Sequence, residues 1–283
     1  MTPIVTAVRS GVLRGLIETR QMHSNGMDLF TQYFWPIILL VTLFFMRNGH
    51  FQATGIGLGS LALPGALGML LASSGLLGIS QFLAVDREDG TLLRAKATPN
   101  GMVGYLIGKI VSISTTVLLQ FVIVLTLGGI IVGGLDVGRV SSWVTMIWVF
   151  LLGMLATLPL GAVLGSLFES PRTVGFVSFP IMGLFAISGI FYPITSLPGW
   201  VQVLAEVFPI YWLGLGMRAA LLPDAAAVVE IGHSWRLWET FGVLSAWTVA
   251  GLLIAPIVLR RMARRESGSS VAARRERAMH RAY

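Results

Sequence analysis

The sequence AVDREDGTLLRAKATP, residues Ala84 to Pro99, is a short charged and turn-forming stretch between two long apolar runs. The run before it carries no formally charged side chain from Phe51 to Val85, and the run after it continues to Val132 with Lys109 as its one charge. About 20 apolar residues suffice to cross the hydrocarbon of a bilayer. We therefore expect the stretch to emerge from a membrane into water, where a soluble partner can reach it.

The composition is that of a membrane protein. Of 283 residues, 55% are hydrophobic and 12% are charged, whereas an average soluble domain has about 25% charged residues. The net charge is +7, and eight of the 20 lysines and arginines follow Leu259 in a polar tail. Anionic lipid headgroups are therefore the expected electrostatic partner, and nucleic acid is not. Cysteine is absent, which excludes disulfides and thiolate metal sites.

The apolar runs predict an all-α integral membrane protein with six transmembrane helices. The expected spans cover residues 30–46, a part of 51–85, 102–132, 142–168, 173–191 and 240–259. We divide the chain into an N-terminal helix region at residues 1–29, a transmembrane domain at residues 30–259 and a basic tail at residues 260–283.

The N-terminal region is expected to form a helix that lies in the membrane interface. Its apolar residues recur along one stripe, while polar residues lie on the other side. The stripe consists of Val5, Val8, Val12 and Leu16, opposite Arg14, Glu18 and Gln21.

Positive charges are distributed unevenly between the two sides of this six-span frame. One side holds Arg9, Arg14, Arg20, Arg87, Arg94, Lys96, Lys109, Arg172 and the arginines of the tail, and the other holds Arg47, Arg139, Arg218 and Arg236. Because positive residues remain on the cytoplasmic side, we expect both termini and the Ala84–Pro99 stretch to be cytoplasmic in a multi-pass protein of the cell membrane.

Prolines interrupt the segment between the fifth and sixth spans. Pro193, Pro198 and Pro209 cut it into pieces that are too short to cross a bilayer. We expect short helices that either dip into the membrane and return or lie at its interface. The aromatic residues Trp200, Tyr211, Trp212, Trp235 and Trp238 fit an interfacial layer.

No residue is predicted to be catalytic or to bind a metal. The four histidines are dispersed, with neither an HExxH motif nor a GxxxxGK[ST] phosphate loop in the chain. Lys109 is expected to snorkel to the cytoplasmic edge. The glycine pairs at 104/108, 129/133 and 161/165 are expected to let helices pack closely.

The Ala84–Pro99 stretch contains the candidate contact residues. Three acids surround one base, a turn and a helix start follow, and then come two leucines. These residues are Asp86, Arg87, Glu88, Asp89, Gly90, Thr91, Leu92 and Leu93. Their composition suits a short helix that binds a groove on a partner and equally suits an ordinary solvated loop.

Two regions resemble a known family. The run DREDGTLLRAKATPNGMVGYLIGK from Asp86 to Lys109 resembles the cytoplasmic loop of type-2 ABC transporter permeases, with an acidic cluster, Gly-Thr-Leu, Thr-Pro and Gly-Lys in the same order. The run SGIFYPITSLPGWVQVLAEVFPIYW from Ser188 to Trp212 is similar to the family's outer segment. The chain departs from the family at Asp86, where Glu is frequent, and at Ala95 and Lys96, where an apolar pair is usual.

The resemblance implies a transport mechanism shared between subunits. Two permease subunits, identical or different, pair across a central path, and ABC ATP-binding subunits dock on a coupling helix formed by residues 86–93. This chain binds no cofactor, and the partner holds ATP and magnesium. The outer segment acts as an external gate, with Pro193, Pro198, Trp200 and Pro209 as its candidate residues.

The leading hypothesis is the permease subunit of an ATP-driven ABC exporter for a hydrophobic or amphipathic compound, such as a drug, an antibiotic or a lipid. The alternatives are an exporter of a glycan or polysaccharide, a polytopic membrane enzyme that acts on lipids, and a non-transporting subunit that senses a ligand or anchors an ATPase. An enzyme would need a polar cluster with a nucleophile, a base or metal ligands, which the sequence does not show.

Overall fold

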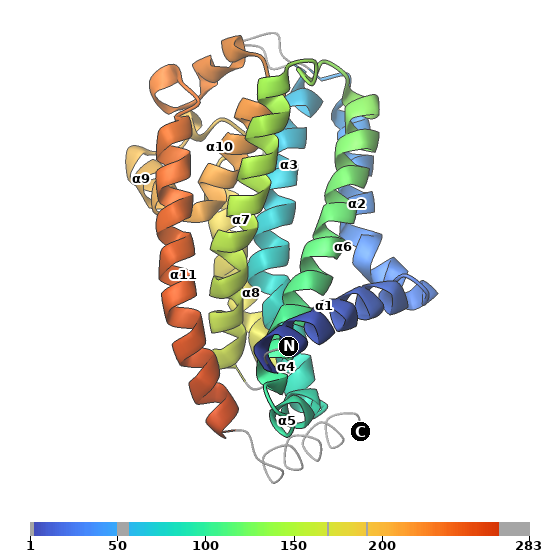
Figure 1. The fold of residues 1–283 in the computed structure, drawn as a ribbon. Coiled ribbons are helices and arrows are strands. Elements are labelled where there is room, and N and C mark those ends of the chain that lie inside the picture. The colour runs from blue at the N-terminus through green and yellow to red at the C-terminus, as the bar shows by residue number, and fades with distance from the viewer. Residues whose placement is uncertain (1–2, 50–56, 169, 191, 266–283) are drawn as a thin grey trace.

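The computed structural model describes residues 3–49, 57–168, 170–190 and 192–265, and these residues form helices and no strand (Figure 1). This confirms the all-α prediction. The elements are α1 (Pro3–Met22), α2 (Gly26–Met46), α3 (Leu58–Ser73), η1 (Ser74–Gly78), α4 (Ile79–Glu88), α5 (Thr91–Lys96), α6 (Gly101–Val132), α7 (Val140–Leu167), α8 (Pro171–Ile187), η2 (Ile194–Ser196), α9 (Gly199–Val207), α10 (Pro209–Leu221), η3 (Asp224–Val229), η4 (Ile231–His233) and α11 (Leu237–Arg265).

Five helical segments of the described chain are long and apolar enough to cross a membrane. They are α2, the continuous run Leu58–Glu88, α6, α7 and α11, and a sixth is reached if the bent pair α9 and α10 counts as one span. The predicted fifth span corresponds to α8, which has 17 residues and is only about 25 Å long at 1.5 Å per residue. It ends early because Gly189 adopts a left-handed backbone with φ of 63°. The predicted end of this span at residue 191 lies outside the described residues.

The short helices predicted between the fifth and sixth spans are present between α8 and α11. α9 and α10 meet at an angle of 91°, because Pro209 starts a new helix after the extended residue Phe208. α10 packs between α3 and α7, and nearly all of its residues are buried. Tyr211 and Trp212 are therefore core residues, whereas the prediction placed them in an interfacial layer.

The second span contains a π-helical segment, η1, between α3 and α4. At this point the span packs tightly on α7: a Cβ atom added to Gly161 would lie 2.1 Å from the carbonyl oxygen of Gly75. Ser80 strengthens the contact, since its Oγ donates to the Gly161 carbonyl at 2.7 Å. The predicted packing role of the 161/165 glycine pair is confirmed. Gly133, by contrast, ends α6 with a φ of 67°, and a Cβ atom added to it would meet no atom within 4 Å.

The last helix extends beyond the predicted boundary between domain and tail. α11 continues through Arg260 and Arg261 to Arg265, so the first residues of the basic tail belong to this helix. Residues 266–283 of the predicted tail lie outside the described residues. Figure 1 shows that α11 ends at the same end of the bundle as α1, α4 and α5.

Candidate functional site

The turn between α4 and α5 has the local structure that its sequence predicts. Gly90 adopts φ of 78° and ψ of 12°, a left-handed conformation that glycine accepts without a steric cost. Asp89 Oδ1 then accepts from the backbone N–H of Thr91 at 2.7 Å, and α5 begins at Thr91. The turn therefore presents a short helix at one end of the bundle (Figure 1).

Asp86 and Arg87, in contrast, point into the protein. Each is 7% exposed. Asp86 Oδ2 accepts from the Tyr105 hydroxyl at 2.7 Å. Arg87 Nη1 donates to the carbonyl oxygens of Ser166 at 3.2 Å and Phe168 at 2.7 Å. These carbonyls lie at the end of α7, where a helix has no backbone donors left for them.

The predicted contact surface therefore needs a correction. Asp86 and Arg87 are occupied by contacts within the chain, and Leu92 is a core residue. Of the predicted set, Asp89 is exposed and Glu88, Thr91 and Leu93 are half-buried, whereas Gly90 is buried. The surface that the turn offers to a partner thus consists of Glu88, Asp89, Thr91 and Leu93, extended by the exposed Arg94.

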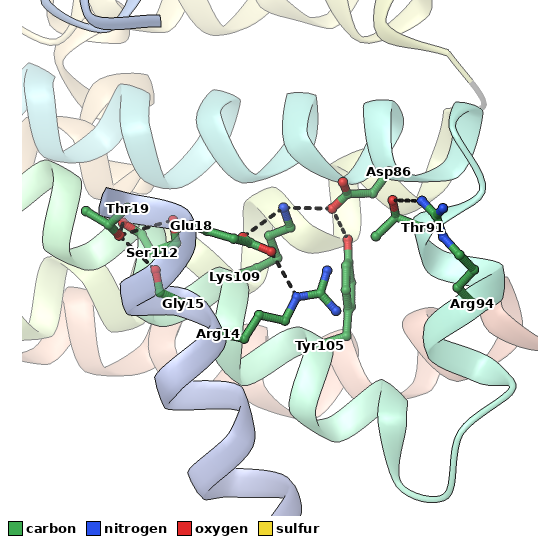
Figure 2. A network of polar contacts seen from close by, with 10 residues as sticks. All are labelled: Arg14, Gly15, Glu18, Thr19, Asp86, Thr91, Arg94, Tyr105, Lys109 and Ser112. Atoms are coloured by element: carbon green, nitrogen blue, oxygen red, sulfur yellow. Dashed lines mark hydrogen bonds and ion pairs between the residues drawn. The ribbon is translucent and has the colours of Figure 1, made fainter. Parts of the chain in front are cut away.

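Lys109 is the centre of a polar network that joins three helices (Figure 2). Its Nζ lies 2.9 Å from Asp86 Oδ2 on α4 and 3.2 Å from Glu18 Oε2 on α1. Arg14 Nε donates to the other oxygen of Glu18 at 2.9 Å. The side chain of Lys109 is 12% exposed. Lys109 therefore ends between two acids, a pairing that the predicted snorkelling to the cytoplasmic edge did not include.

α1 packs on α6 through small residues that repeat every four positions. Ala7, Gly11, Gly15 and Thr19 form the buried face of α1. A Cβ atom on Gly11 would lie 2.6 Å from the Gly104 carbonyl oxygen, and one on Gly15 would lie 2.5 Å from that of Gly108. Such close backbone approach is what small residues permit. The predicted 104/108 pair is thereby confirmed as a packing site.

The apolar stripe predicted for α1 faces away from the bundle. Val5, Val8 and Leu16 are exposed, and Val12 is half-buried. Figure 1 shows α1 lying across the lower end of the bundle, at a steep angle to α2. The amphipathic pattern thus marks the side of α1 that faces away from the other helices, while a face of small residues makes the contact with α6.

We name Asp86, Arg87, Lys109 and Glu18 the joint, because they connect the α4–α5 turn to α7, α6 and α1. The charges of Lys109 and Arg14 offset those of Asp86 and Glu18, which reduces the cost of removing them from water. The described residues contain no group of three or more His, Cys, Asp or Glu side chains that could hold a metal ion. The joint thus links the turn to three helices through ion pairs and hydrogen bonds.

The predicted gate residues lie on three consecutive elements. Pro193 precedes η2, Pro198 precedes α9, and Trp200 on α9 is 72% exposed. Pro209 is buried at the start of α10. Of the neighbouring charges, Glu206 pairs with Arg236.

An apolar cavity of about 590 Å³ lies between α2 and the second span. Its walls include Trp35 of α2, Met69 of α3 and Phe185 of α8, and the π-helical segment η1 contributes Ser74, Leu77 and Gly78. A few amides also line it, among them Gln81 and Gln120. A mainly apolar surface with a few polar groups is typical of sites that bind small amphipathic molecules.

The apolar spans, the bent pair α9 and α10 and the buried polar network behind a short turn helix are the features of a multi-pass membrane protein. The model of the ABC-2 family transporter protein matches residues 17–257, and the chain belongs to this family. It is a membrane permease of an ABC transporter, without an ATPase domain of its own, and the family implies an ABC ATP-binding partner. No curated protein matches the chain.

Proposed function

We propose that the chain is the permease subunit of an ATP-driven ABC exporter that moves a hydrophobic or amphipathic compound, such as a drug, an antibiotic or a lipid, out of the cell. The observation that supports this cargo class is the cavity of about 590 Å³ with its mainly apolar lining. No comparable observation favours a glycan cargo, a lipid-modifying enzyme or a subunit that only senses or anchors.

The proposed orientation places the α5 end in the cytoplasm of a cell-membrane protein. α4, α5 and the ends of α1 and α11 share this end (Figure 1), so both described ends of the chain face the same side. Arg260, Arg261 and Arg264 lie here on α11. Positive residues at this end agree with cytoplasmic retention, and anionic lipids are their expected partners.

The ATP-binding partner docks, in this proposal, on Glu88, Asp89 and Leu93 at the α4–α5 turn. It binds ATP and magnesium, and its closure pulls the turn. The joint carries this displacement to α7 through Arg87 and to α1 and α6 through Lys109. A second permease subunit, identical or different, completes the transport path, and the spans change between two arrangements whose populations ATP binding shifts.

Reversing the charge of Glu88 and Asp89 together is expected to uncouple ATP hydrolysis from transport. Basic residues at these positions would oppose the basic groups expected on the partner, and like charges across an interface are unfavourable. Transport per ATP hydrolysed should fall about tenfold while ATP hydrolysis persists. The measurement is cargo efflux against ATP hydrolysis in proteoliposomes that contain both subunits.

Two control variants separate the docking role from local structure. Asp28→Lys reverses another exposed charge, on the first turn of α2, and should leave coupling unchanged. Asp89→Asn keeps an oxygen that can accept from the Thr91 N–H and should preserve the start of α5. Unchanged transport in Glu88→Lys/Asp89→Lys would contradict the docking surface.

The cargo class is tested by copurification in mild detergent. The chain should retain an ABC ATPase, and amphipathic compounds should change the rate of ATP hydrolysis by the complex. Substituting Met69→Trp, which adds a bulky ring to the cavity wall, should weaken this response selectively. A complex that responds to glycans and not to amphipathic compounds would contradict the proposed cargo.

A further inference from the structure

The last turn of α10 carries a buried cation, Arg218. Its Nε lies 2.7 Å from Oε1 of Glu230, and the two side chains are 4% and 2% exposed. Glu230 lies between η3 and η4, which we together call the cap (residues 224–233). Figure 1 shows the cap at the end of the bundle opposite α5. The ion pair therefore joins α10 to the cap.

The same turn of α10 holds two further segments at this end. Arg218 Nη1 donates to the Gly189 carbonyl oxygen at 3.1 Å, in the chain that leaves α8. The backbone N–H of Asp136, between α6 and α7, donates to the Leu221 carbonyl at 2.9 Å. Arg218 thus lies where the connections after α6, α8 and α10 meet.

The ion pair is only partly satisfied. Arg218 Nη2 and Glu230 Oε2 have no hydrogen-bond partner among the described residues, and the Arg218 Nε–H is not aligned for a hydrogen bond to Oε1. The nearby Tyr211 hydroxyl also lacks a partner in this part of the chain. Polar atoms of a buried ion pair that have no protein partner are the atoms that water can hydrate. Hydration therefore offsets part of the free energy lost when this contact opens.

α10 also connects the cap to the wall of the apolar cavity. Gly214 of α10 packs directly on Gly68 of α3, where an added Cβ atom on Gly68 would lie 2.8 Å from the Gly214 Cα. Ala66 and Met69 lie close to Gly68 on α3 and line the cavity. Since no side chain separates the two backbones, α3 and α10 have to move together or break this contact.

We propose that the Arg218–Glu230 pair is a latch that holds the cap closed over the outer end of the transport path, and that entry of water between the two side chains opens it. The inference rests on the proposed function for the identity of the outer side. Arg218 is a positioning residue in this step, since it acts on the path through α10 and the cap. The pair suits a contact that breaks and re-forms, because both of its groups are well solvated once they separate.

The absence of cysteine from the chain allows a direct test. Ala226→Cys introduces one thiol into η3 of the cap, at a fully buried position. A membrane-impermeant maleimide added from the cap side labels it only when the cap opens, so the labelling rate reports the open population. Adding Glu230→Gln should increase the rate roughly tenfold or more, because a buried guanidinium cannot release its charge as a carboxylate can.

Two further variants make the comparison specific. Glu230→Asp keeps the charge on a shorter side chain and should label at an intermediate rate, which also provides a result if Glu230→Gln does not reach the membrane. Asp224→Asn removes one partner of an ion pair in the same cap, but Asp224 is 79% exposed and pairs with Arg139 at 3.2 Å. This control should label at the parental rate, because exposed pairs contribute little.

The latch would be overturned if the Ala226→Cys protein were labelled at the same rate with and without Glu230→Gln. It would also be overturned if Asp224→Asn raised the labelling rate as much as Glu230→Gln does. In the complex with its ATPase, ATP should change the labelling of the parental protein and leave the fast rate of Glu230→Gln unaltered. In a complex whose ATP hydrolysis responds to cargo, a parental rate that ignores ATP would show a static contact and also overturn the latch. The comparison between variants needs neither cargo nor ATPase, so failure of the proposed function is detected separately, by the absence of cargo-dependent ATP hydrolysis.

Discussion

Replacing Lys109 with methionine is expected to destabilise the protein by about 3–5 kcal/mol, the cost of leaving buried charges without their partner. Methionine fills a similar volume but leaves Asp86 and Glu18 facing each other across the gap that Lys109 Nζ occupies. α1 should loosen from α4, and ATP hydrolysis should no longer drive transport. The measurements are thermal unfolding of the purified complex and cargo moved per ATP.

Arg20→Met is the matched control for this substitution. Arg20 is an exposed cation on the same helix as Glu18, and an exposed substitution of this kind changes stability by no more than about 0.5 kcal/mol. Lys109→Arg should recover only part of the loss, because a planar guanidinium does not replace a compact ammonium between two acids. A Lys109→Met protein with parental stability and coupling would contradict the role of the joint.

Gly15→Ala is expected to cost roughly 1–3 kcal/mol and to separate α1 from α6, as overpacking of a tight contact does. The new Cβ atom would lie 2.5 Å from the Gly108 carbonyl oxygen and 2.9 Å from Val111 Cβ. A backbone carbonyl cannot rotate away as a side chain can, so the helix itself has to move. This shift would also draw Glu18 away from Lys109, and a fall in coupling should accompany the loss of stability.

Gly242→Ala tests whether the effect arises from packing or from glycine in general. Gly242 lies within α11 and has no neighbour within 4 Å of an added Cβ atom. Alanine favours the helical backbone by about 1 kcal/mol relative to glycine, so this variant should be as stable as the parent or more so. Thermal unfolding of the two variants side by side decides the matter, and equal stability would contradict close packing of α1 on α6.

Much of the fold could be predicted because membrane spans depend on length and hydrophobicity alone. Five of the six predicted spans, the turn at Gly90, the start of α5 and the short helices between α8 and α11 follow from apolar runs and from the positions of glycine and proline. The length of α8 did not follow, because the sequence stays apolar up to Phe191 while the backbone turns at Gly189.

The direction in which side chains point was the harder part. In a membrane protein the lipid-facing surface is as apolar as the interior, so the apolar stripe of α1 did not indicate its packing face. The small residues at positions 7, 11, 15 and 19 were the signal that could have found it. Asp86, Lys109 and Glu18 come from three helices far apart in sequence, and no spacing rule relates them. A lone cation within a span was the available indication that acids lie nearby.

The π-helical segment Ser74–Gly78 determines which side of α4 faces the rest of the protein. Each residue of an α-helix turns the chain by about 100°. The wider π-helical turn takes up one extra residue, and this residue changes the direction in which the side chains of α4 point. A chain one residue shorter at this point would keep an equally apolar span and an intact α4–α5 turn. It would nevertheless present Asp86 and Arg87 about 100° away from Lys109 and from the end of α7. The π-helical segment therefore sets the rotation of the span. With this rotation the middle of the span lines the cavity, while Asp86 reaches Lys109 and Arg87 reaches the end of α7.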